Sequence, residues 1–399
     1  MNVWSEKLSG LVIFRGILED DVVLKLMNVF KVKTIDETLI DAIADFEATL
    51  FENTTNWTQY LLRIVLESEN IYIRGEANRC KNIILETGAL KELDFLQELS
   101  ELSLRKYVEQ NLGQAGNKIF DLLMEWEVEQ VDFIKLYLER VSTVNIKGYG
   151  MFAKHFVFTV ENSNLIPVKY PDRQKLIELP GYENERRQII LNTKALLVGN
   201  PANNVLLYGD AGTGKSSTVK AISNEFTAEG LRLIEVKKNQ LYQIPTIIDQ
   251  LANNPLKFIL FVDDLSFTVN DDNFAALKAI LEGSVCRRSS NVVVYATSNR
   301  RHLIKESWSD RAGDDIHESD TRQELASLSA RFGLIVTFLQ PEKEKFKDIL
   351  LALAEQYDID YNNDLIAQAE QFAIRTGGRS PRVARQFIEL YKSGVLFKE

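Results

Sequence analysis

The sequence predicts an α/β fold in which helices sandwich a parallel five-stranded sheet, with a C-terminal helical lid and an N-terminal, mostly α-helical domain. Beyond residue 182, short β-branched or aliphatic runs alternate with helical stretches, a pattern typical of parallel sheets covered on both faces. Between residues 18 and 144, apolar residues recur instead at helical spacing. A chain of 399 residues is long enough for two or three domains.

These patterns divide the chain into four predicted parts. The junction between the first helical part and the sheet is indicated by β-like runs at Phe156–Val160 and Leu165–Lys169, which glycines and prolines separate. The predicted parts are an acidic α-helical domain without an assigned role (1–145), a junction with short strands (146–182), the sheet-containing core (183–340) and the helical lid (341–399).

The composition of the chain argues against several classes of protein. The longest apolar run has six residues, Ile349–Ala354, whereas a helix that crosses a bilayer needs about 20. Two cysteines and three histidines are too few, at their spacing, for a disulfide framework or a zinc cluster. We therefore expect a chain that works in the reducing cytoplasm, without a signal for export.

Charge is distributed unevenly along the chain. Residues 1–145 hold 15 Lys and Arg against 25 Asp and Glu, so they carry the whole formal net charge of −10. Phosphates of nucleic acids are contacted mainly by Lys and Arg. The acidic N-terminal part is therefore not expected to grip nucleic acid.

The first strand of the predicted core, Asn204–Tyr208, runs directly into a glycine-rich loop. Residues 209–216 read GDAGTGKS, which matches the pattern G-x-x-x-x-G-K-[ST] of phosphate-binding loops. The glycines let backbone N–H groups turn around an anion, and the following helix directs its positive end toward it. Lys215 is expected to contact the β and γ phosphates, and Ser216 to bind Mg²⁺. The predicted nucleotide-binding residues of this loop are Gly209, Asp210, Ala211, Gly212, Thr213, Gly214, Lys215, Ser216 and Ser217. The alternative is a glycine-rich turn without a ligand.

A carboxylate that completes the magnesium site is expected on a neighbouring strand. The run Phe258–Val262 ends in Asp263 and Asp264. Asp263 is predicted to bind Mg²⁺ directly or through water, and Asp264 to polarise the attacking water. A glutamate would reach further than Asp264 by one methylene, so slow turnover is part of this prediction. The alternative is that both acids only end a strand or cap a helix.

Two further polar residues are candidates for catalysis. Asn299 follows the strand run Asn291–Ala296 and is expected to bond the γ-phosphate or the attacking water, the alternative being an ordinary turn residue. Arg331 precedes the fifth strand run, Leu334–Phe338. An arginine at such a place can neutralise charge on a phosphoryl group held by a neighbouring subunit, so this prediction requires an oligomer. The alternative is a local ion pair.

An arginine cluster lies in the predicted lid. Residues 375–385 contain four arginines and no acid. Within them, Ser380 suits the N-cap of a helix and Pro381 suits its first position. Arg382, in the first turn of that helix, is predicted to contact the nucleotide. Arg379 and Arg385 are expected to face solvent.

In this order and spacing, the motifs resemble those of the AAA+ ATPases, which combine a Walker A loop, a Walker B strand, a sensor-1 residue, an arginine finger and a sensor-2 arginine in a helical lid. The resemblance covers about residues 170–399 and implies a P-loop NTPase core that binds ATP and Mg²⁺. It also implies that residues 176–182 border the adenine. The paired acids look like those of the replication-initiator and helicase-loader branch. Four stretches look more closely like a bacterial family of predicted AAA+ ATPases named only as a domain of unknown function: 202–209, 261–267, 296–303 and 382–387.

The leading hypothesis is an ATP-driven conformational machine. It couples Mg-ATP binding and hydrolysis to a change imposed on an unidentified macromolecular partner, as a homo-oligomer in which Arg331 acts in trans. Residues 1–145 or the charged loop 301–324 would engage the partner. Three alternatives stay open: a slow or non-hydrolysing nucleotide-dependent switch or adaptor, a helicase-loader-like DNA-associated ATPase, and a P-loop phosphotransferase.

Overall fold

The computed structural model describes residues 3–32, 36–111, 122–265, 276–278, 280–281, 290–299, 331–360 and 362–395. The chain splits into two compact units, Met1–Lys154 and His155–Glu399. The predicted loop 301–324 lies outside the described residues. None of the helices in the described ranges is both long enough and apolar enough to cross a membrane.

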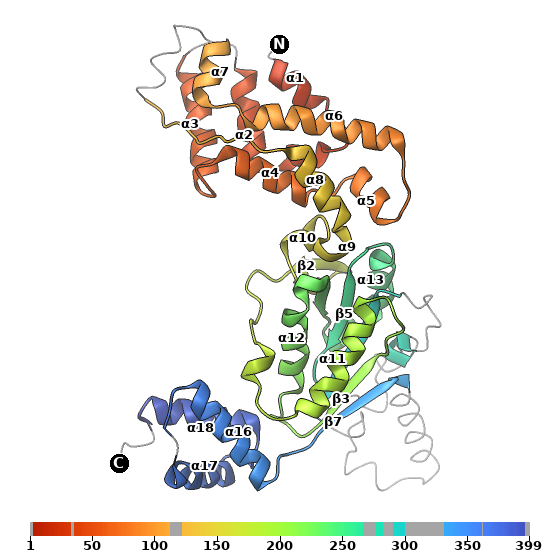
Figure 1. The fold of residues 1–399 in the computed structure, drawn as a ribbon, viewed down its shortest axis with the longest axis vertical. Helices are drawn as coiled ribbons and strands as arrows, with labels where there is room; N and C mark the ends of the chain where they lie inside the picture. The colour runs from red at the N-terminus through yellow and green to blue at the C-terminus, as the bar shows by residue number, and fades with distance from the viewer. Residues whose placement is uncertain are drawn as a thin grey trace. The chain divides into compact units, whose positions relative to one another are not determined.

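The first unit is helical in all of its described elements (Figure 1). Most of its helices begin at an Asp or Asn whose side chain accepts a backbone N–H bond from the first turn, as at Asp20, Asn56 and Asn82. Its elements are α1 (Val3–Ser9), η1 (Arg15–Glu19), α2 (Asp21–Lys31), α3 (Glu37–Phe51), α4 (Trp57–Glu67), α5 (Ile71–Ala77), α6 (Ile83–Ser100), α7 (Leu104–Asn111), α8 (Phe133–Ser142), α9 (Val144–Lys147) and α10 (Met151–Lys154).

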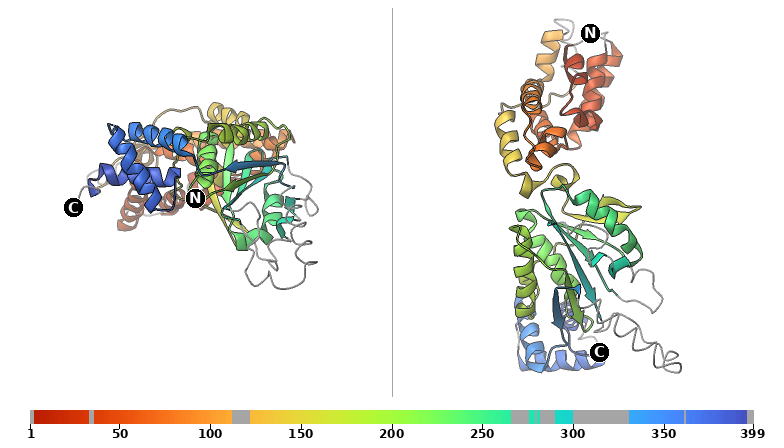
Figure 2. Two further views of the ribbon diagram at one scale, coloured as in Figure 1. Left: turned by 90° about the horizontal axis from the view of Figure 1, so that it is seen from below. Right: turned by 90° about the vertical axis from the view of Figure 1, so that its right-hand side faces the viewer.

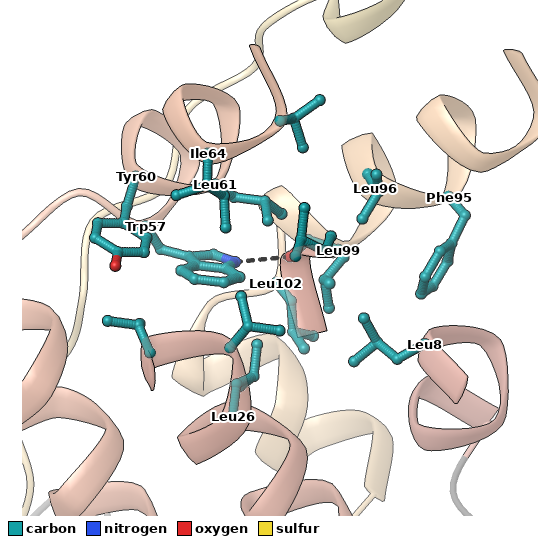
Figure 3. Packing of buried hydrophobic residues seen from close by; sticks show 14 of the residues in the cluster. Leu8, Leu26, Trp57, Tyr60, Leu61, Ile64, Phe95, Leu96, Leu99 and Leu102 are labelled. Atoms are coloured by element: carbon teal, nitrogen blue, oxygen red, sulfur yellow. Dashed lines mark hydrogen bonds between the residues drawn. The ribbon is translucent and has the colours of Figure 1, made fainter. Parts of the chain in front are cut away.

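Aromatic residues organise the core of this unit. The Trp57 indole N–H donates to the carbonyl oxygen of Leu99 at 2.9 Å, so a polar atom in the apolar interior is satisfied (Figure 3). The Trp126 indole donates in the same way to Leu102 at 2.8 Å. Phe46 lies edge-on between the two tryptophans, with ring centroids 5.6 and 4.9 Å away. These contacts tie α3, α4 and the end of α6 into one core.

The second unit is built on a seven-stranded sheet in the order β2-β1-β4-β5-β6-β3-β7. All neighbouring strands are parallel except β1 and β2, which form an antiparallel pair. The strands are β1 (Val157–Glu161), β2 (Asn164–Pro167), β3 (Val205–Gly209), β4 (Leu231–Glu235), β5 (Lys257–Val262), β6 (Val292–Ser298) and β7 (Leu334–Phe338).

The prediction of five strands was therefore too low by two. The five predicted runs form β3 to β7, and the two short runs of the predicted junction extend the same sheet, because β1 pairs in parallel with β4. Local alternation shows that a strand forms, but not which sheet edge it joins. The predicted architecture, a parallel sheet between helices followed by a C-terminal set of helices, is otherwise confirmed.

Helices cover both faces of the sheet. Figure 2 shows α11 (Glu183–Leu197) and α12 (Lys215–Glu225) on one face and α13 (Ile244–Leu251) on the other. Short 3-10 segments occur at η3 (Leu176–Glu178), η4 (Thr227–Glu229) and η5 (Lys238–Gln243). The three helices of the lid are α16 (Lys343–Gln356), α17 (Asn363–Arg375) and α18 (Pro381–Lys392).

Candidate functional site

The glycine-rich loop leaves the end of β3 in a conformation that only glycine fits. Gly209 has a φ of +134°, and a Cβ atom there would lie 2.1 Å from the carbonyl oxygen of Phe338 in β7. Gly212 has a φ of +76°, and a Cβ there would lie 3.0 Å from Ser380 Oγ in the lid. The loop is thus pressed against β7 at its start and against the lid in its middle.

Lys215 is the first residue of α12 and is buried. Its ammonium group donates to the carbonyl oxygens of Gly209 at 2.9 Å and Asp210 at 2.7 Å, so it lies within the curve of the loop. Burial lowers the pKa of this ammonium, while the carboxylates of Asp210, Asp264 and Asp263 raise it. A desolvated cation at a helix N-terminus is a suitable group for binding a phosphate.

Ser216 and Asp263 lie in direct contact. The Ser216 hydroxyl donates to Asp263 Oδ1 at 2.6 Å. Ser216, on α12, follows β3 and Asp263 follows β5, and these two strands are not adjacent, because β6 lies between them. The carboxylate was expected on the strand next to β3, but it follows the second strand away. The loop and the start of α12 therefore reach across the end of β6.

The second acid has an unusual backbone conformation and a polar partner. Asp264 has a φ of +51°, in the left-handed region that residues with a side chain rarely adopt. Asn299, at the end of β6, donates from Nδ2 to Asp264 Oδ1 at 2.8 Å. Two of the predicted catalytic side chains are thus brought together within hydrogen-bond distance.

Thr297 is a contact that sequence reasoning missed. Its hydroxyl donates to Asp263 Oδ1 at 2.5 Å and accepts the backbone N–H of Asp264 at 2.9 Å. The signal available in the sequence was the pair of polar residues, Thr297 and Ser298, at the end of a run that is otherwise mostly apolar.

The Asp210 side chain faces the end of β7 instead of the centre of the loop. Its carboxylate accepts the backbone N–H of Gln340 at 2.6 Å, and its own N–H donates to Phe338 O at 3.0 Å. The carboxylate of Asp210 thereby anchors the loop to the segment that leads into the lid.

A cavity of about 190 Å³ opens between the loop and the lid. Arg382 reaches the loop with its backbone N–H, which donates to Gly212 O at 3.2 Å, and its side chain is exposed and lines the cavity. Arg385 lines the cavity too and donates to the Glu178 carbonyl oxygen at 2.9 Å, so the expectation that it faces solvent was wrong. The cavity is lined by Gln174, Leu179, Pro180, Arg186, Gly212, Thr213, Gly214, Ser217, Leu353, Pro381, Arg382 and Arg385.

Two arginines of this region have acidic partners. Arg186 is buried on α11 and pairs with Glu183 at 3.2 Å, and burial lowers its pKa. Sequence reasoning missed it, because one basic residue in a charged helix gives no local signal. Arg379 is half-buried and pairs with Glu370 at 2.8 Å, so its side chain is engaged within the lid.

Arg331 lies at the opposite end of the sheet from the loop. It precedes β7, whose first residue pairs with Val205 and whose last residue pairs with Gly209. The five residues of β7 span about 15 Å at roughly 3.3 Å per residue. Arg331 therefore does not contact the loop of its own chain.

The donors that converge at the loop suit Mg²⁺ and a polyphosphate. Hydroxyl and carboxylate oxygens, here from Ser216 and Asp263, are the ligands that Mg²⁺ prefers. Lys215 and the N-terminus of α12 supply positive charge for phosphate oxygens. The residues present therefore fit the cofactors that the motifs imply.

Comparisons with known proteins found similar solved structures and one matching family. The Holliday junction branch migration motor RuvB of Thermotoga maritima is 18% identical, with 56% of this chain and 66% of that chain covered and a TM-score of 0.34. AMPPCP-bound DnaA from Aquifex aeolicus is 16% identical, with the same coverage and a TM-score of 0.41. The chain thus spans just under two thirds of the length of either protein. Residues 152–395 match the family described as a protein of unknown function, DUF815. This match covers more than half of the chain and confirms the resemblance to a family named only as being of unknown function: the chain belongs to the DUF815 family.

Proposed function

We propose that this protein is an AAA+ ATPase that binds Mg-ATP and couples its hydrolysis to a conformational change imposed on a macromolecular partner. The observation that carries the proposal is the 2.6 Å hydrogen bond between Ser216 and Asp263. It joins the loop that would hold the phosphates to the strand end that would hold the metal. A phosphate-binding loop alone would support only nucleotide binding.

Each predicted residue has a role in this proposal. The ammonium of Lys215 and the loop N–H groups bind the phosphate oxygens, and Ser216 and Asp263 hold the cation. When bound, Mg²⁺ supplies positive charge that offsets charge on the β and γ phosphates. Asp264 orients and polarises the attacking water, and Asn299 holds the Asp264 carboxylate at 2.8 Å. Arg382 contacts the nucleotide from the lid.

The lid supplies the coupling. Asp210 in the loop is bonded to Gln340, which lies between β7 and α16, and Gly212 is bonded to Arg382 in α18. Gly212 and Arg382 both line the cavity between loop and lid, so a nucleotide that enters it would contact both partners of the second connection. Movement of the lid against the core is therefore the expected mechanical output.

Nucleotide binding is tested with Lys215→Ala. The variant should remain folded and lose at least tenfold in ATP affinity, because the buried ammonium is removed from the loop. Lys220→Ala is the matched control: Lys220 lies on the same helix, pairs with Glu235 at 3.3 Å and is not part of the loop. Unchanged ATP binding by Lys215→Ala would place the nucleotide elsewhere.

Hydrolysis is tested by phosphate release without an added acceptor. An ATPase releases phosphate under these conditions, whereas a phosphotransferase releases little. Tight ATP binding with no release at any protein concentration would instead support a nucleotide-dependent switch. That second candidate is favoured by the short side chain of Asp264, whose carboxylate is bonded to Asn299.

Action of Arg331 in trans is tested by mixing variants. Arg331 is separated from the loop of its own chain by the length of β7, so only a neighbouring copy would present it to a phosphate. Arg331→Ala should bind ATP with nearly unchanged affinity and turn over slowly. Mixing it with Lys215→Ala should restore part of the activity, because each variant supplies what the other lacks. Unaltered turnover by Arg331→Ala would remove the inter-subunit claim.

A further inference from the structure

The side chain of Thr297 connects the two acids at the end of β5. Thr297 is 1% exposed and lies on β6, the strand between β5 and β3. Its hydroxyl donates its only proton to Asp263 Oδ1 at 2.5 Å and accepts the backbone N–H of Asp264 at 2.9 Å. One buried hydroxyl thus contacts both residues that the proposed function assigns to the metal and to the attacking water.

Three donors converge on one oxygen of Asp263. Oδ1 accepts from Ser216 Oγ at 2.6 Å, from Thr297 Oγ1 at 2.5 Å and from the backbone N–H of Asp264 at 3.1 Å. Such bonds fix the rotation of the carboxylate and use the lone pairs of Oδ1. Within the described residues, no donor occupies Oδ2, which leaves that oxygen for a cation. Hydrogen bonds of this kind orient metal ligands in other sites.

Thr297 also supports the unusual backbone at Asp264. A φ of +51° is unfavourable for a residue with a Cβ atom and persists only where its surroundings hold it. The Thr297 hydroxyl accepts the N–H of Asp264, and the Thr297 carbonyl oxygen accepts the N–H of Leu265 at 2.7 Å. Side chain and backbone of one residue therefore bracket the turn that presents the Asp264 carboxylate.

We propose that Thr297 is a positioning residue for both acids: its hydroxyl fixes the carboxylate of Asp263 for the cation and holds Asp264 in the left-handed turn. The proposal rests on the proposed function for the identity of the ligand. The effect of Thr297 on the turn at Asp264 does not depend on the proposed function.

Two substitutions separate the hydroxyl from the volume of the side chain. Thr297→Val keeps the shape and removes the hydroxyl, whereas Thr297→Ser keeps the hydroxyl and removes a methyl group. If Thr297 served only to fill space, Ser would be the more harmful change. If its hydroxyl positions the acids, Val is the more harmful change.

The first measurement is the affinity for AMPPCP with Mg²⁺ and with EDTA, by calorimetry. We expect Thr297→Val to lose about 10- to 100-fold of the affinity that Mg²⁺ adds, the range found when outer-shell partners of metal ligands are removed. Its affinity in EDTA should stay close to that of the wild type, because the Thr297 hydroxyl is hydrogen-bonded to Asp263 and Asp264, which lie outside the phosphate-binding loop. Thr297→Ser should keep most of the Mg²⁺ effect. An unchanged Mg²⁺ effect in Thr297→Val, or a larger loss in Thr297→Ser, would overturn the proposal.

The second measurement needs no nucleotide. Crystal structures of the free wild type and of Thr297→Val should differ at Asp264, which we expect to leave the left-handed region in the variant. If the wild type binds no nucleotide, the proposed function fails, while this comparison still decides the role of Thr297. A variant that keeps a φ near +51° at Asp264 together with the wild-type orientation of Asp263 would refute the positioning role.

Discussion

Glu47 makes the stability of the N-terminal unit depend on pH. This residue of α3 is 4% exposed. One carboxylate oxygen accepts the backbone N–H of Met124 at 3.2 Å, and the other has no hydrogen-bond partner among the described residues. Burial raises the pKa of the carboxyl group from 4.5 to about 7, and the bond from Met124 opposes that rise. Between about pH 4.5 and pH 7, the folded unit therefore holds a proton at Glu47 that the unfolded chain releases.

The sign of the effect follows from proton linkage. Because the pKa is higher in the folded state, the contribution of Glu47 to the free energy of unfolding is greatest below pH 4.5, falls as the pH rises toward 7 and is level above it. Each pKa unit corresponds to about 1.4 kcal/mol, so the full shift amounts to about 3 kcal/mol. That is a large fraction of the stability of a typical domain.

Glu47→Gln removes the ionisation and keeps an oxygen for Met124. At pH 8 we expect the variant to be more stable than the wild type by about 3 kcal/mol, and at pH 5 the difference should shrink to about 1 kcal/mol or less. Urea denaturation at pH 5, 6, 7 and 8, followed by tryptophan fluorescence, measures the difference in stability at each pH. The fluorescence reports on the core of the N-terminal unit, because Trp57 and Trp126 contact Phe46, the residue before Glu47.

The control is Glu52→Gln, at the exposed end of the same helix, which should keep the wild-type pH dependence. The reasoning is refuted if the wild type is equally stable at pH 5 and pH 8. It is refuted as well if Glu47→Gln loses stability with rising pH as steeply as the wild type does.

Two further substitutions test the backbone geometry of the glycine-rich loop and the hydrogen bonds of the Glu92 carboxylate. Gly209→Ala should abolish ATP binding and destabilise the second unit, since strain at positive φ costs about 1 to 3 kcal/mol and the new methyl group would also meet the Phe338 carbonyl. Gly199→Ala, also at positive φ but with open space around it, should show the strain alone in thermal unfolding. The carboxylate of Glu92 accepts hydrogen bonds from three backbone N–H groups of the loop after α1, those of Val12, Ile13 and Phe14, so Glu92→Gln should lower the free energy of unfolding by about 2 kcal/mol in urea titrations. Glu98→Gln, on the same helix but in an exposed ion pair, should cost less than about 1 kcal/mol.

Sequence patterns predicted those parts of the fold that short segments determine by themselves. The loop after β3 was predictable because glycine, lysine and serine at fixed spacing have few other uses. The five runs that became β3 to β7 were predictable because buried parallel strands are mostly apolar. The position of Arg331 before the fifth run likewise followed from the order of elements, since parallel strands start at one edge and end at the other.

Contacts between distant segments were not predictable in the same way. Nothing in the composition of residues 157–161 indicates that they pair with β4, because any sheet edge satisfies a strand. The orientation of Arg385 toward the cavity depends on how α18 turns against the loop, which is set by packing. Thr297 reads as an ordinary β-branched strand residue until its acidic neighbours on β5 are in place.

The position of β6 explains why its end is the place where the candidate site is organised. Strands in a sheet lie about 4.8 Å apart, so β3 and β5, with β6 between them, are separated by about twice that distance. A loop from β3 and an acid from β5 can meet only by passing over the end of β6. The side chain found at that crossing is Thr297, which is hydrogen-bonded to the Asp263 carboxylate and to the backbone N–H of Asp264. Asn299, two residues beyond it, is hydrogen-bonded to the Asp264 carboxylate. Any change in the distance between β3 and β5 when a nucleotide binds must therefore be accommodated at β6, because the backbone of β6 is hydrogen-bonded to both strands.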